Sequence, residues 1–352
     1  MDTSIVIIII GLFIFWGHYL AGLFERKGIP DVLGLMLIGM LIGPIFHLIH
    51  PASFGKFGSL FSNLVLIFIL FESGTDLKID EVKASFRDSA AITTFGFLTT
   101  WVATVLLCTF FLDLPLLPSL FIGATLGGTS SAVVVGLVKK IGVQPRTSTT
   151  LIIESAESDI FTLAIPLSIL TLMITGELAA YSVVSQFISS IIISLIMGIG
   201  GAFLWSFIIN KIPALKKTKF STPAFLLVIY GITEYLHFSG PLTALSFGIA
   251  IGNLEYFEPK LLEKYVPNQR IILPKAERSF FGQLVFLLRT FFFVFIGISI
   301  KIDRLDSLTC GAAITAVLFL VRLVLVNFAI RQLSKLLTYS FLSTTIVLVL
   351  WY

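Results

Sequence analysis

Apolar runs long enough to cross a lipid bilayer as helices follow one another along almost the whole chain. A bilayer core of roughly 30 Å needs about 20 mostly apolar residues in helical form. The strands of a membrane barrel would instead alternate apolar and polar residues over segments of about ten residues. Runs of the helical kind lie at about 4–23, 31–50, 58–74, 89–112, 115–138, 148–175, 179–210, 221–238, 241–254, 280–301, 307–332 and 336–352. The sequence therefore predicts an all-α polytopic membrane protein of about 12 transmembrane segments.

Charged residues are few and unevenly placed. They make up 12% of the chain, against roughly 25% in soluble domains, while hydrophobic residues make up 57%. Nineteen of the 24 Lys and Arg residues fall in one set of alternate loops, whereas Lys56, Lys301 and Arg304 fall in the other set. Because basic loops stay on the cytoplasmic side, this asymmetry predicts a cell-membrane protein with its N-terminus outside. The net charge of +4 thus reflects membrane orientation and does not indicate a nucleic-acid partner.

The chain also repeats itself at long range. Three pairs of segments match in the same order: LMLIGMLIGP (35–44) with ALSFGIAIGN (244–253), FESGTDLKID (71–80) with VFIGISIKID (294–303), and AAIT (90–93) with AAIT (312–315). Each match relates one predicted segment to the seventh segment after it, so the two copies cross the membrane in opposite directions. Inverted repeats of this kind are typical of secondary transporters. A complete second copy would add a thirteenth segment, and we expect the chain, which stops at Tyr352, to carry a truncated second repeat.

Three acids lie within six residues of the sixth segment, in the stretch IIESAESDIFTLAIPL (152–167). Asp159 is about eleven residues from the cytoplasmic end, which at 1.5 Å per residue is roughly half of the bilayer core. Burial favours the neutral form of a carboxylate, so this acid binds a proton tightly, and a monovalent cation can replace that proton. We expect Asp159 to be a cation and proton site, with Ser155 one turn before it as a further ligand. The alternative is a structural acid satisfied by a neighbouring helix.

Two arginines inside apolar segments offer partners for the other two acids. Arg322, in LFLVRLVLV, is expected to form a structural ion pair with Glu154, because each charge alone in the membrane costs several kcal/mol. Direct ion binding by Glu154 is the alternative. Arg289, in FLLRTFFF, is a possible partner of Glu157.

The fifth segment, LFIGATLGGTSSAVVVGLV, carries five consecutive residues at 127–131 that are poor helix formers. Backbone freed from a helix is tolerated in a membrane only where it lines protein or water. The run therefore predicts a discontinuous helix whose carbonyl groups face Asp159, with a small-residue packing face as the alternative. Glu72, at the end of the third segment, is either an acid on the ion path or an interfacial residue.

Other chemistries have less support. An intramembrane aspartyl protease needs two facing aspartates that share a proton, but Asp159 is the only Asp that we place deep inside a segment. No metal site or cofactor is predicted, because the remaining candidate ligands lack the necessary spacing. Those candidates are His18, His47 and His50, whereas Glu234 and His237, near the outer end of the eighth segment, are expected to face a crevice or an interface. The chain is therefore not expected to be an enzyme.

At these residues the chain resembles the monovalent cation:proton antiporter superfamily, and most of all the prokaryotic electroneutral branch of the sodium/hydrogen exchanger family. That branch carries a Glu-Ser-x-x-Asn-Asp pattern in its sixth segment, and here Ser158 stands in place of Asn. Its FEGG-like motif appears as FESG (71–74), and its SGPL…GN motif spans 239–253. Thr129 matches the threonine of its unwound helix. The following Ser130 and Ser131 depart from its Thr-Asp-Pro and are similar to the potassium/proton efflux branch.

The resemblance implies roles for individual residues. Asp159 would bind cation and proton, with assistance from Ser155, Ser158 and Thr129. Glu72 would lie on the ion path, and Glu154 would pair with Arg322. No cofactor is implied beyond the transported ions.

The resemblance also implies the function and the assembly. It implies a homodimeric antiporter in pH homeostasis that exchanges Na⁺, with K⁺ as the other candidate, for H⁺ in an electroneutral cycle of alternating access. Scaffold helices would occupy 1–88 and 176–306, the moving core 89–175, and an incomplete second core panel 307–352. The alternatives are a K⁺/H⁺ efflux-type antiporter, an inactive truncated remnant, or a membrane sensor of the same fold.

Overall fold

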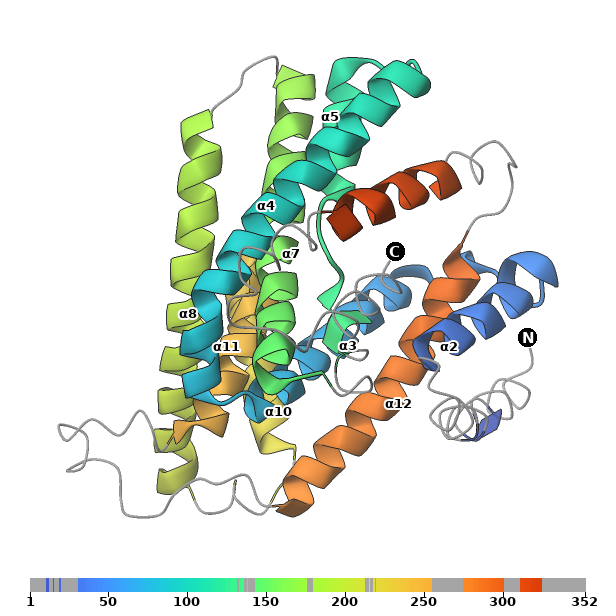
Figure 1. The fold of residues 1–352 in the computed structure, drawn as a ribbon. Helices are drawn as coiled ribbons and strands as arrows, with labels where there is room; N and C mark the ends of the chain where they lie inside the picture. The colour runs from blue at the N-terminus through green and yellow to red at the C-terminus, as the bar shows by residue number, and fades with distance from the viewer. Residues whose placement is uncertain are drawn as a thin grey trace.

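The computed structural model describes residues 31–131, 133–135, 143–175, 180–212, 220–254, 275–300 and 311–324, together with isolated positions at 11, 12, 15, 19, 138, 215 and 218. Every regular element within these ranges is a helix (Figure 1). Most of the predicted segment 4–23, all of 336–352 and most of the loop 255–279 lie outside the described residues. The all-helical prediction is confirmed for the described part of the chain.

The helices follow the predicted apolar segments closely. They are α2 (Asp31–Met40), the short turns η1 (Leu41–Ile45) and η2 (Pro51–Phe54), α3 (Gly55–Asp76), α4 (Ile79–Phe111), α5 (Leu116–Leu126), α7 (Pro145–Thr175), α8 (Ala180–Lys211), α10 (Ser221–Tyr235), α11 (Gly240–Gly252), α12 (Lys275–Ser299) and a further helix, Gly311–Val324. Within the described ranges, four stretches are long and apolar enough to cross a membrane: Ile79–Phe111, Pro145–Ile174, Ile188–Lys211 and Phe281–Ser299.

Helix α4 begins at Ile79, well before the predicted start near residue 89. Its first turns are charged, so an apolar run does not detect them. They remain helical because they pack on the start of α7. Arg146 Nη2 donates to Asp88 Oδ2 at 2.7 Å, and the Ser85 hydroxyl donates to the Arg146 carbonyl at 3.3 Å. These polar groups connect the first turns of α4 to the start of α7.

The helices form two groups that meet along α7 (Figure 1). In one group α4, α5 and α7 pack on one another. In the other group α3 packs on α11 and α12, α12 packs on α2, and α8 packs on α11 and α10. Helix α7 also contacts α8 and α11, so it joins the groups.

The internal repeat is visible as two equivalent helix crossings, α2 with α12 and α11 with α3. A Cβ atom added to Gly39 would lie 2.2 Å from the Val294 carbonyl oxygen, and one added to Gly248 would lie 2.4 Å from that of Phe71. These residues correspond in the matched sequences. Where two copies related by a two-fold axis contact each other, each contact occurs twice with the partners exchanged, as it does here. The predicted inverted repeat is therefore confirmed in the packing of the described helices.

The side chain of Asn253, at the end of α11, holds the short connection between α3 and α4. Its Nδ2 donates to the Leu77 carbonyl at 2.7 Å, and its Oδ1 accepts from the Ile79 N–H at 3.0 Å. Lys78, at the N-cap of α4, makes no side-chain capping bond. Asn253 therefore caps α4 from another helix, at the point where the chain passes from one group of helices to the other.

Candidate functional site

The fifth apolar segment is broken in its middle. Helix α5 ends at Leu126, residues 127–130 are not helical, and the helix resumes at Ser131. The N–H groups of Val133 and Val134 both donate to the Ser130 carbonyl, at 3.1 and 3.0 Å, which marks the new start. The discontinuous helix predicted from this run is therefore present.

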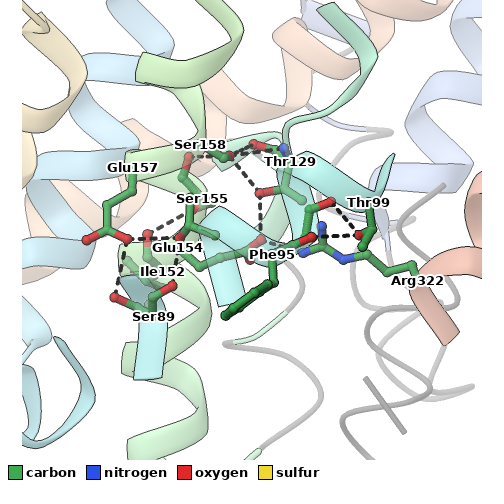
Figure 2. A network of polar contacts seen from close by, with 12 residues as sticks. Ser89, Phe95, Thr99, Thr129, Ile152, Glu154, Ser155, Glu157, Ser158 and Arg322 are labelled. Carbon is green, nitrogen blue, oxygen red and sulfur yellow. Dashed lines mark hydrogen bonds and ion pairs between the residues drawn. The ribbon is translucent and has the colours of Figure 1, made fainter. Parts of the chain in front are cut away.

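The break lies directly against α7. A Cβ atom added to Gly128 would lie 2.3 Å from Thr162 Cγ2, so only glycine allows this approach. The Thr129 N–H donates to Ser158 Oγ at 3.0 Å, and the two hydroxyl oxygens of these residues are 2.9 Å apart. Ser158 can in turn donate to the Thr129 carbonyl at 3.2 Å or to the Ser155 carbonyl at 2.9 Å. Figure 2 shows this contact, in which a serine satisfies a backbone N–H that the broken helix leaves open.

Asp159 faces the resumed helix. Its Oδ2 accepts a hydrogen bond from the Ser131 hydroxyl at 2.5 Å. Asp159 is partly exposed, whereas Glu154 is 1% and Glu157 is 9% exposed. The most accessible of the three acids is therefore the one predicted to bind ions. Ser131 was not singled out from the sequence as a partner, although it belongs to the run that predicted the break.

Ser155 was expected to assist Asp159, but its hydroxyl donates to the Ile152 carbonyl of its own helix at 2.8 Å. Serine commonly makes such a bond inside a helix, because the carbonyl one turn back is always within reach. The hydroxyl hydrogen is therefore directed along α7 and not toward the carboxylate.

Glu154 and Arg322 form a buried ion pair, in which Arg322 Nη2 donates to Glu154 Oε1 (Figure 2). The two side chains are 1% and 2% exposed. The guanidinium passes over Gly96 of α4, where an added Cβ would lie 3.0 Å from Nη1. Thr129 Oγ1 donates to Glu154 Oε1 at 3.4 Å, which links the pair to the break. The structure thus brings together Glu154 and Arg322, the two charges that were predicted to pair, and places them beside the predicted ion site.

The pairing of Glu157 with Arg289 is corrected by the structure. Glu157 Oε2 accepts from Thr93 at 2.8 Å and from Ser89 at 3.4 Å, both on α4. Arg289 lies on α12, which packs mainly on α2 and α3. An apolar segment does not tell which neighbour it will face, and hydroxyl groups of α4 satisfy this acid in place of a cation.

Glu72 lies on α3, whereas the other residues predicted to bind ions lie on α7 and at the break that follows α5. It is half-buried on α3, and an added Cβ at Gly282 of α12 would lie 3.6 Å from its Oε1. Its predicted role on the ion path remains a prediction. Among the described residues there is no cluster of three or more His, Cys, Asp and Glu that would suit a metal centre.

The assembled site offers the Asp159 carboxylate, the hydroxyls of Thr129, Ser131 and Ser158, and unwound backbone, near the middle of the long apolar helix α7. Oxygen donors of this kind suit a hard cation or a proton. Comparison with known proteins points to the same chemistry. The family model described as sodium/hydrogen exchanger, transmembrane, matches residues 8–350. The chain belongs to the sodium/hydrogen exchanger family. This exchanger-family chain is accordingly a multi-pass membrane protein.

Relatives of this exchanger-family chain carry the names of two kinds of antiporter. It is 28% identical to the K(+)/H(+) antiporter NhaP2 of Shewanella sp. (strain MR-4) over 65% of its own length and 40% of that protein. It is 26% identical to Na(+)/H(+) antiporter 1 of Methanocaldococcus jannaschii over 87% of its own length and 71% of that protein. The chain thus spans less than half the length of the NhaP2 relative.

Solved structures show the same fold as this exchanger-family chain. The sodium proton antiporter MjNhaP1 from Methanocaldococcus jannaschii at pH 8 superposes with a TM-score of 0.68 at 22% identity, covering 99% of this chain and 82% of that one. A second structure of MjNhaP1 gives a TM-score of 0.73 at 22% identity, over 94% and 79% of the two chains. The inverted-repeat antiporter fold is therefore established, whereas the exact number of segments is not fixed by the described residues.

Proposed function

We propose that this chain is a secondary active transporter that exchanges a monovalent cation for H⁺ across the cytoplasmic membrane by alternating access. The observation that carries the proposal is the setting of Asp159, a partly exposed carboxylate on a long apolar helix beside the break at 127–130. An acid buried in a membrane is expected to have a functional role. One carboxylate that holds either ion, but not both, couples the two movements.

Sodium is the favoured cation and potassium the second candidate. The relative named a Na(+)/H(+) antiporter aligns over 87% of this chain, whereas the relative named a K(+)/H(+) antiporter aligns over 65%. The broader match supports sodium. Of the neighbouring residues Ser158 and Asp159, only Asp159 is an acid. A single acid at this position further suggests that one cation is exchanged for one proton.

The proposal includes a membrane orientation and an assembly. We propose the plasma membrane as the location, and the excess of Lys and Arg in alternate loops favours an orientation with the N-terminus outside. We propose that α4, α5 and α7 form the moving core together with 307–352, and that 1–88 and 176–306 form a scaffold through which two copies associate. The packing of α4, α5 and α7 mainly on one another supports this division.

Purified full-length protein in proteoliposomes with an internal pH dye tests the proposal. Addition of Na⁺ or K⁺ should shift the internal pH, and Asp159→Asn should abolish the shift. The matched control is Asp113→Asn, because Asp113 is exposed outside the helices and asparagine tolerates its positive φ of 50°. Exchange by Asp159→Asn would disprove the mechanism. If no alkali cation shifts the internal pH in proteoliposomes of the unmodified protein, an inactive remnant or a sensor would be favoured.

A further inference from the structure

Two adjacent serines at the break have different surroundings. Ser131 is 2% exposed, and its hydroxyl donates to Asp159 Oδ2 at 2.5 Å. Ser130 is exposed and contributes its carbonyl to the start of the resumed helix. Ser131 is the first residue of that helix, so its position is fixed by regular backbone structure. A fixed, buried hydroxyl therefore lies against the proposed ion-binding carboxylate.

The contact between Ser131 and Asp159 is not needed to attach the break to α7. Thr129 and Ser158 already join the two elements through the Thr129 N–H, its carbonyl and both hydroxyls. Gly128 adds a close approach to Thr162. The hydrogen of the Ser131 hydroxyl is donated to a carboxylate on another helix and not to a group of its own helix. Attachment of the break to α7 therefore does not explain why a hydroxyl lies against Asp159.

We infer that Ser131 is a ligand of the transported cation and a determinant of cation affinity and selectivity. This inference rests on the proposed antiporter function. A hydroxyl is both donor and acceptor, so its oxygen can turn a lone pair toward a cation that binds at Oδ2 of Asp159. The hydrogen bond seen here is then the resting contact that the cation displaces. Because Ser131 is held by the helix, it limits the size of the space beside Asp159, and cavity size contributes to the choice between hard cations.

The test compares Ser131→Ala with the matched control Ser130→Ala. The control makes the same chemical change, loss of a serine hydroxyl, at the neighbouring residue. Exchange rates in proteoliposomes are measured against the concentrations of Li⁺, Na⁺ and K⁺. We expect Ser131→Ala to raise the apparent KM for the preferred cation about tenfold, to change the ratio of KM values between Na⁺ and K⁺, and to leave the maximal rate within about twofold. Ser130→Ala should match the unmodified protein, and Ser131→Thr, which keeps the hydroxyl, should stay within about threefold of it.

A second readout does not depend on transport. Binding of radioactive ²²Na⁺ or ⁸⁶Rb⁺ to the purified protein in detergent should weaken by a similar factor in Ser131→Ala only. If Ser131→Ala and Ser130→Ala give the same KM values and the same binding, the ligand role of Ser131 is wrong while the antiporter function stands. The ligand role is also wrong if Ser131→Ala loses maximal rate without a change in KM or selectivity. If the unmodified protein neither exchanges nor binds these cations, both proposals fail.

Discussion

Ser158 of α7 accepts a hydrogen bond at 3.0 Å from the backbone N–H of Thr129, in the break of the discontinuous helix. A broken helix leaves backbone groups without partners, and in a membrane such groups cost several kcal/mol unless protein satisfies them. A single buried hydroxyl therefore stabilises the break and joins it to the helix that carries Asp159.

Replacement of Ser158 by alanine should lower stability by about 1–3 kcal/mol, because the Thr129 N–H is left buried without a partner. The melting temperature of the purified protein in detergent measures the effect. The control is Ser168→Ala on the same helix, since the Ser168 hydroxyl only donates to the Ala164 carbonyl of its own helix, at 2.7 Å. Equal melting temperatures for the two variants would show that the contact does not hold the break.

Gly128→Ala should be severely destabilising or inactive, because the new Cβ would lie 2.3 Å from Thr162 Cγ2. The second-site change Thr162→Ser removes that methyl group and keeps the hydroxyl, so the double variant should recover part of the loss. Gly200→Ala is the control, since nothing lies within 4 Å of a Cβ at that position on α8. The unmodified protein, the two single variants and the double variant form a double-mutant cycle, for which melting temperature and exchange rate are measured. No recovery in the double variant would contradict the proposed clash.

The features that the sequence predicted correctly are those set by a strong local cost. The break at 127–130 follows from five poor helix formers in an apolar segment, and the pair of Glu154 with Arg322 follows from the cost of two isolated charges. The inverted repeat followed from matched segments, and equivalent glycine contacts confirm it. In each case few arrangements were energetically allowed.

The features that were missed depend on which helix faces which. Thr93 and Ser89 satisfy Glu157 only because α4 packs on that face of α7. Ser131 reaches Asp159 only because the helix resumes at that residue. Weakly polar hydroxyls occur throughout the chain, so their presence in a segment does not specify a partner. Tertiary packing supplies this information.

Loss of one charge from the buried pair should be more damaging than loss of both. Glu154→Gln or Arg322→Met leaves one buried charge uncompensated, which is expected to cost about 3–5 kcal/mol. The double variant, with neutral side chains of similar size, should melt closer to the unmodified protein than either single variant. Folded yield and melting temperature are the measurements. A double variant whose loss equals the sum of the two single losses would show that the charges act independently.

Asn253 should respond differently to alanine and to aspartate. Asn253→Ala removes the donor to the Leu77 carbonyl and the acceptor for the Ile79 N–H, and we expect a loss of about 1–3 kcal/mol in stability. Asn253→Asp keeps the acceptor but places a carboxylate oxygen against the Leu77 carbonyl, which lies 2.7 Å from Nδ2, so this variant should melt no higher than the alanine variant. Amide hydrogen exchange at Ile79 provides a local readout, because its N–H loses the acceptor in the alanine variant and keeps it in the aspartate variant. If aspartate is as stable as asparagine, the donated bond to Leu77 contributes nothing to stability, and the accepted bond from Ile79 alone accounts for the contribution of Asn253.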